Sequence, residues 1–136
     1  REARETAMQR TTFALSSLYL AAVGLGLMLF PAEFGIGAVP ADATPALIAL
    51  LRLLGGPFLG IATLNWLSRN VRDAVALRPI LIANLIGFGA VAANDVWGVA
   101  SGEARDLAKV FLVVHLLFTI AFGALYLSMR SAYRRM

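Results

Sequence analysis

The chain has 136 residues, of which 60% are hydrophobic and 15% are charged, and its mean hydropathy is +0.77. Soluble domains carry about 25% charged and 45–50% apolar residues, so this composition indicates an integral membrane protein. The absence of cysteine excludes disulfides, thiolate catalysis and cysteine-based metal sites. The net charge of +4 does not indicate nucleic-acid binding, because the basic residues flank apolar segments and do not alternate with aromatic ones.

Four apolar segments are long enough to cross a bilayer as helices, which takes about 20 residues. They are residues 12–30, 46–67, 79–99 and 107–128. Pro79 begins the third segment, a position that the first turn of a helix tolerates. The segments are too long for barrel strands and lack their alternation. The sequence therefore predicts an all-α fold, a four-transmembrane-helix bundle that forms one integral membrane domain over residues 1–136.

The basic residues predict the orientation of this bundle. With four spans, the two termini and the middle loop lie on one side, and they carry Arg1, Arg4, Arg10, Arg69, Arg72, Arg78, Arg130, Arg134 and Arg135. The opposite side carries only Arg105 and Lys109. Because basic loops stay in the cytoplasm, both termini are expected there, in a multi-pass protein of the cell's inner membrane. The opposite, outer loop, residues 31–45, is apolar, and it is expected either to fold back as a short interfacial cap or to form an ordinary turn-rich loop.

Polar residues gather at one depth of the predicted bundle. Arg52, Asp95 and His115 each lie a few residues to the outer side of the middle of their span, and Glu33 lies just above them. Charged groups at membrane depth usually face the bundle interior, and an arginine fork fits a carboxylate, so an ion pair between Arg52 and Asp95 is predicted. His115 and Asn94 are expected to complete the hydrogen bonding. Three interpretations stay open: a structural pair, an outward-facing polar pocket for a ligand, proton or lipid headgroup, and side chains that snorkel to the interface.

The third span also presents a recognisable face. Asn84, Phe88, Val91 and Asp95 follow helical spacing and are expected to share it. Asn94 points about 100° away around the helix and is expected to have different partners.

Small residues on three spans predict close helix packing. Gly56 and Gly60 form one pair, Ala22 and Gly26 form another, and Gly87 marks the third span. They indicate either packing within the bundle or an interface with another subunit.

His115 is the only histidine, and in a helix it has the chemistry of a chlorophyll or haem ligand, although a bis-histidine haem is excluded. Asn65, near the cytoplasmic end of its span, is expected to hydrogen-bond between helices. No catalytic residue and no metal site is predicted, and no cofactor is identified beyond bound lipid or such a pigment or haem at His115.

The stretches "LRLLGGPFLGIATLNWLSRN" and "RPILIANLIGFGAVAANDVWGVASG" resemble small bacterial four-helix membrane proteins of the DoxX-like group. In that group a glycine-containing second helix precedes a short basic loop and a third helix. The resemblance extends over residues 12–128 and implies the four-helix fold but no catalytic residues.

The expected function is that of a non-catalytic accessory or structural subunit of a larger membrane complex. The alternatives are a small transporter or channel and a protein that binds lipid or another hydrophobic ligand in the outer-leaflet polar pocket. Enzyme activity is not favoured, because no nucleophile motif, metal cluster or nucleotide loop is present. The expected partners are the bilayer and other membrane subunits or further copies of the chain.

Overall fold

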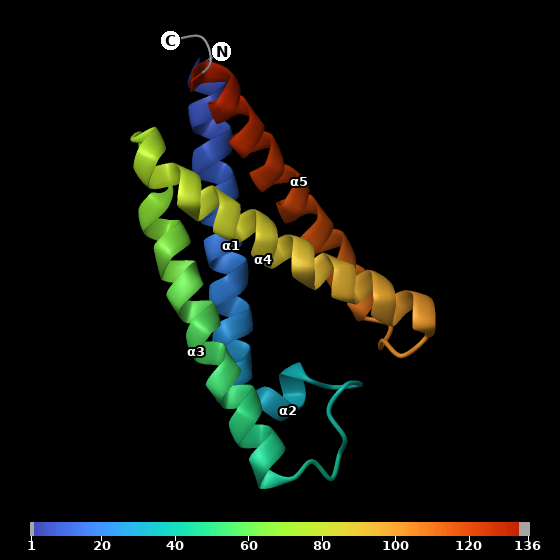
Figure 1. Cartoon of the computed structure of the whole chain (residues 1–136). Helices are drawn as coiled ribbons and strands as arrows, with labels where there is room; N and C mark the ends of the chain where they lie inside the picture. The colour runs from blue at the N-terminus through green and yellow to red at the C-terminus, as the bar shows by residue number, and fades with distance from the viewer. Residues whose placement is uncertain (1, 134–136) are drawn as a thin grey trace. The chain divides into compact units, whose positions relative to one another are not determined.

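The computed structural model describes residues 2–133 and the side chains of residues 3–129. Its helices are α1 (Glu2–Leu29), α2 (Pro31–Phe34), α3 (Pro45–Ser68), α4 (Ala74–Ser101) and α5 (Ala108–Tyr133), and no strand occurs in this part of the chain (Figure 1). All but α2 are long and apolar enough to cross a membrane, which confirms the predicted all-α fold with four candidate spans. Of the predicted basic flanks, Arg1, Arg134, Arg135 and the side chain of Arg130 lie outside the described residues.

Two helices begin several residues earlier than the apolar segments predict. Helix α1 begins at Glu2 and so includes polar turns before its span. Helix α4 begins at Ala74, because the carboxylate of Asp73 accepts a hydrogen bond from the N–H of Val75 at 3.0 Å and caps the helix. The prediction that Pro79 occupies the first turn is therefore wrong, and Pro79 lies inside the helix. Hydropathy marks the apolar part of a helix, whereas the cap sets its start.

The chain forms two compact units. One comprises residues 13–67 and is called the α1–α3 unit. The other comprises, among the described residues, the first turns of α1 (residues 2–12) together with residues 68–133, and is called the α4–α5 unit. The predicted single domain over residues 1–136 stays a prediction.

Two glycines set the distance between α1 and α3. A Cβ atom added to Gly24 would lie 2.9 Å from the carbonyl oxygen of Gly55, and one added to Gly55 would lie 2.6 Å from that of Gly24. Only a glycine fits on either side of this backbone contact. A Cβ added to Gly56 or Gly60 would meet no heavy atom within 4 Å, so neither glycine makes the close contact of this unit. Their two expected roles, packing within the bundle or an interface with another subunit, stay predictions. The predicted Ala22 is exposed.

Buried polar side chains also join α1 to α3. The Asn65 amide, which is fully buried, donates to the Ser16 hydroxyl at 3.0 Å and confirms the expected hydrogen bond between helices. The Ser16 hydroxyl donates in turn to the carbonyl of Phe13 at 3.1 Å. The Ser17 hydroxyl donates to the carbonyl of Ala62 at 2.6 Å. In a lipid environment these bonds replace those that water would make.

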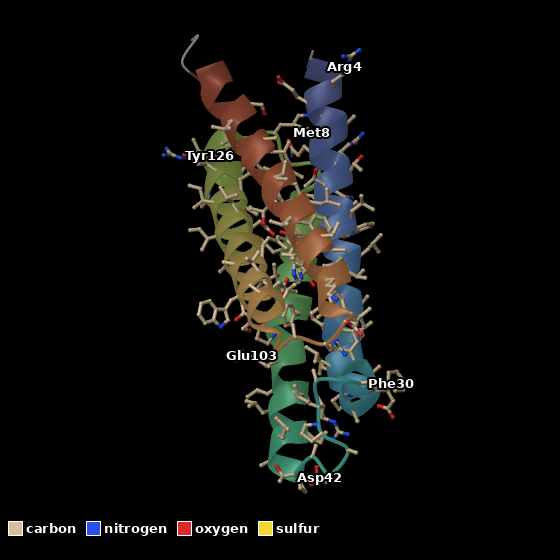
Figure 2. All side chains as sticks on the ribbon, turned by 90° about the vertical axis from the view of Figure 1, so that its right-hand side faces the viewer. Arg4, Met8, Phe30, Asp42, Glu103 and Tyr126 are labelled. Atoms are coloured by element: carbon tan, nitrogen blue, oxygen red, sulfur yellow. The ribbon has the colours of Figure 1, made fainter. Side chains whose placement is uncertain are left out.

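The segment between α1 and α3 folds back onto α1. A Cβ added to Gly26 would lie 2.6 Å from Cδ2 of Phe34, so the aromatic ring of α2 covers this predicted packing residue. Figure 2 labels Phe30, where α1 ends and α2 begins, and Asp42, in the loop that leads to α3. The fold-back agrees with the folded alternative expected for this loop, and its place at the membrane interface stays a prediction.

Adjacent glycines on α3 give a matched test of the α1–α3 contact. Gly55→Ala is expected to lower the free energy of unfolding by about 1–3 kcal/mol, because the added methyl group overlaps backbone. Gly56→Ala is expected to leave it unchanged or to raise it by up to about 1 kcal/mol through helix propensity. Far-ultraviolet circular dichroism during unfolding by sodium dodecyl sulfate measures both, and equal effects would contradict the contact.

Candidate functional site

A tight loop, residues 102–107, joins α4 to α5. Gly102 ends α4 with a positive φ of 74°, and its N–H donates to the carbonyl of Val99. The N–H of Ala104 donates to the carbonyl of Gly98 at 3.0 Å. This short connection lays α5 back along α4 as an antiparallel hairpin (Figure 1).

One stripe of α4 is buried in this unit. It consists of Leu77, Leu81, Asn84, Phe88 and Ala92, and it continues to the half-buried Asp95. The prediction that Val91 belongs to this face is wrong, because Val91 is 40% exposed. Four residues advance a helix by about 40° beyond one turn, which brings Ala92 nearer than Val91 to the centre of the stripe.

Asp95 and His115 meet across the hairpin. Oδ2 of Asp95 lies 2.5 Å from Nδ1 of His115, and the two side chains are only 14% and 11% exposed. The rings of Phe88 and Phe111 flank the imidazole, with centroids 6.2 and 6.3 Å from its own. One turn along α5, the Thr119 hydroxyl donates to the carbonyl of His115 at 2.7 Å. The pair therefore occupies an apolar, aromatic setting on α4 and α5.

This geometry sets the chemistry of the imidazole. A carboxylate beside Nδ1 fixes the orientation of the imidazole ring and directs that nitrogen towards α4. Since Nδ1 faces Asp95, Nε2 is the ring nitrogen that a pigment or haem iron would have to use. That role of His115 stays a prediction.

The structure brings together two of the five residues of the predicted cluster. Asp95 and His115 form the pair described above. Asn94 follows the predicted geometry by pointing away from Asp95 and is exposed. Arg52 on α3 and Glu33 on α2 are exposed residues of the α1–α3 unit, and the predicted ion pair between Arg52 and Asp95 stays a prediction.

An aromatic cluster beside the pair was missed by sequence reasoning. The Phe88 ring lies 4.8 Å from that of Phe118 and 5.7 Å from that of Phe122, which is fully buried. The available signal was the spacing of His115, Phe118 and Phe122, which places all three on one face of α5. The cluster packs the hairpin next to the Asp95–His115 pair.

Within the described residues, no group of three or more histidine, cysteine, aspartate or glutamate side chains is placed to hold a metal ion. Comparison of the chain with protein-family models, with curated proteins and with solved structures returned no match.

Removing either member of the pair is expected to destabilise the hairpin, and by unequal amounts. Asp95→Ala removes the carboxylate that faces Nδ1 of His115 and should cost about 1–3 kcal/mol of unfolding free energy. His115→Ala leaves a buried carboxylate uncompensated and should cost about 3–5 kcal/mol. The exposed neighbour provides the control, since Asn94→Ala should change stability by less than about 0.5 kcal/mol. The free energy of unfolding is measured by detergent titration for the intact chain and the three variants. Equal values for all four proteins would refute the pair.

Proposed function

We propose that this chain is a non-catalytic accessory subunit of a larger membrane complex and that α3 docks against a helix of a partner subunit. One observation carries the proposal: α3 has two faces of small residues, and α1 uses only one of them. Gly55 packs against α1, whereas a Cβ on Gly56 or Gly60 meets no heavy atom within 4 Å.

The second face of α3 has the chemistry of a helix interface in a membrane. Gly56 and Gly60 are one turn apart, and small residues at this spacing let another helix approach closely. Thr63, on the same side, donates its hydroxyl to the carbonyl of Leu59 at 2.9 Å, so it needs no water. Leu67 continues this side and is 67% exposed. Such a face favours a packed helix because glycine backbone gains more contact from a helix than from disordered lipid chains.

The proposal includes an orientation. With both termini in the cytoplasm of a cell with an inner membrane, the basic loop between α3 and α4 lies at the cytoplasmic surface. The loop between α4 and α5 lies at the outer surface. The distribution of arginine residues supports this arrangement.

Copurification tests the α3 interface. A tagged chain extracted from its native membranes in a mild detergent is expected to retain a stoichiometric partner, identified by mass spectrometry. Gly60→Leu is expected to lower the retained partner by about tenfold, because steric exclusion removes about 1–2 kcal/mol of helix packing.

The matched control is an open glycine on another helix. Gly87 of α4, which sequence analysis also assigned to packing, has no heavy atom within 4 Å of an added Cβ. Gly87→Leu should leave the partner bound. Loss of the partner in this variant, with full retention in Gly60→Leu, would move the interface from α3 to α4. Purification of the intact chain without any partner would overturn the subunit proposal.

Because the chain has no cysteine, single introduced cysteines report the orientation without background. In intact cells a membrane-impermeant maleimide is expected to label Glu103→Cys, in the loop between α4 and α5, and to leave Asn70→Cys unlabelled. Asn70→Cys should react only after the membrane is permeabilised. The reverse pattern would contradict the proposed orientation.

A further inference from the structure

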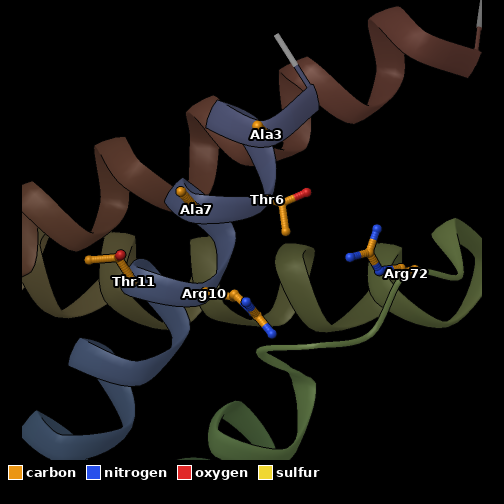
Figure 3. Close-up of a pocket in the computed structure, with 6 residues that line it drawn as sticks. All are labelled: Ala3, Thr6, Ala7, Arg10, Thr11 and Arg72. Atoms are coloured by element: carbon orange, nitrogen blue, oxygen red, sulfur yellow. The ribbon is translucent and has the colours of Figure 1, made fainter.

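A basic pocket lies in the α4–α5 unit, away from the Asp95–His115 pair. It has a volume of about 630 Å³, within the range of small-ligand sites (Figure 3). The described residues that line it are Ala3, Thr6, Ala7, Arg10 and Thr11 of α1 and Arg72 of the loop between α3 and α4. The pocket therefore joins the polar start of α1 to the basic middle loop.

The α1 lining is a single helical face. Its five residues follow i, i+3, i+4, i+7 and i+8 spacing, so they lie along one side of the helix. The small side chains of Ala3 and Ala7 leave room there. Thr6 and Thr11 supply hydroxyl groups to the lining, and Arg10 supplies a guanidinium group (Figure 3). This face offers hydrogen-bond donors around an open space.

Hydrogen bonds hold the middle loop against α1. The Gln9 amide donates to the carbonyl of Val71 at 2.7 Å and to that of Ser68 at 3.4 Å. Nε of Arg10 donates to Oδ1 of Asn70 at 2.7 Å. These bonds hold the loop against α1 in the absence of a ligand. Binding therefore carries a smaller entropy cost for ordering the loop.

The charge of the described lining is positive. It contains two guanidinium groups and no carboxylate. Asp73, next to Arg72, is engaged as the cap of α4 through its bond to Val75. Glu5 of α1 lies about 200° around the helix from Ala3 and so faces away from the pocket side. Among the side chains of residues 3–129, an anion at this place would therefore meet hydrogen-bond donors and no lining carboxylate.

The position of the pocket along α1 corresponds to the depth of the membrane surface. The lining ends at Thr11, and the apolar part of the helix begins with Phe13. Once α1 spans a bilayer, the pocket lies at the depth of the lipid headgroups. One guanidinium group can donate two parallel hydrogen bonds to the oxygens of a phosphate. Basic pockets between membrane helices bind anionic lipid headgroups. We propose that this pocket binds the phosphate group of an anionic ligand, which is either a lipid headgroup or a soluble phosphate compound.

Retention of an anionic lipid tests the first source. The purified chain is exchanged into micelles that hold equal amounts of phosphatidylglycerol and phosphatidylcholine, and bound lipid is counted by native mass spectrometry. The intact chain is expected to retain phosphatidylglycerol in preference to phosphatidylcholine. Arg10→Gln and Arg72→Gln should each weaken this retention by about tenfold, because each removes a charged hydrogen-bond donor.

Titration with inorganic phosphate tests the second source. The chain in an uncharged detergent without added phospholipid is followed by isothermal titration calorimetry. Binding of phosphate that is lost in the same two variants, without preference for phosphatidylglycerol, would assign the pocket to a soluble phosphate compound. Lipid retention without phosphate binding would assign it to a headgroup.

Two further variants separate the pocket from general charge effects. Arg78→Gln removes an exposed positive charge from α4 outside the lining and should leave binding unchanged. Gln9→Ala keeps the net charge but releases the loop, and it should weaken binding several-fold. All variants should keep the helical circular dichroism of the intact chain, since the changed side chains are not part of the apolar core. Equal binding by the Arg10→Gln, Arg72→Gln double variant, or binding of neither probe by the intact chain, would overturn the proposal.

Discussion

A helix that crosses a bilayer has no water with which to satisfy polar side chains, and this constraint shapes both units of the protein. In the α1–α3 unit, Asn65 and Ser16 bond to each other, and Ser17 bonds to the backbone of the facing helix. In the α4–α5 unit, Asp95 and His115 pair beneath a cluster of phenylalanine rings. In each case a polar group at membrane depth takes its partner from a facing helix, so satisfying it also fixes helix register.

The same constraint separates the regions to which a function is assigned. The Asp95–His115 pair lies inside the hairpin and serves first to hold α4 against α5. The uncovered glycine face of α3 has no polar group that needs a partner, and it suits another apolar helix. The basic pocket lies where α1 leaves the apolar segment, which is where the proposed anion would bind. The proposed subunit would use the glycine face to pack against a partner and the basic pocket to hold an anion, while the Asp95–His115 pair holds α4 against α5.

Hydropathy and spacing were sufficient to predict the four helices and the face of α4 that carries Asp95. They did not predict where α4 starts, because a single side chain, Asp73, caps it in the polar loop. They also did not single out Gly55, the glycine that packs against α1, because Gly55 and Gly56 are adjacent glycines and only the rotation of α3 distinguishes them. For the site, the shared depth of Asp95 and His115 was readable from the sequence. Charge complementarity drew attention to Arg52 as a partner of Asp95, and that pair stays a prediction, whereas the contact of Asp95 with His115 depends on how α4 and α5 are rotated in the hairpin, which one sequence does not contain.

The central claim is that Asp95 and His115 pair within the membrane, and solid-state nuclear magnetic resonance in lipid bilayers tests it most directly. Since the chain has one histidine, ¹⁵N-labelled histidine gives signals from His115 alone. With ¹³C-labelled aspartate, strong dipolar coupling between Nδ1 and one carboxyl carbon is expected, and Asp95→Asn should identify that carbon by shifting its signal. The contradicting result is that the histidine nitrogen lacks this coupling while the Asp95 carboxyl carbon couples to arginine nitrogens. Arg52, and not His115, would then be the partner of Asp95.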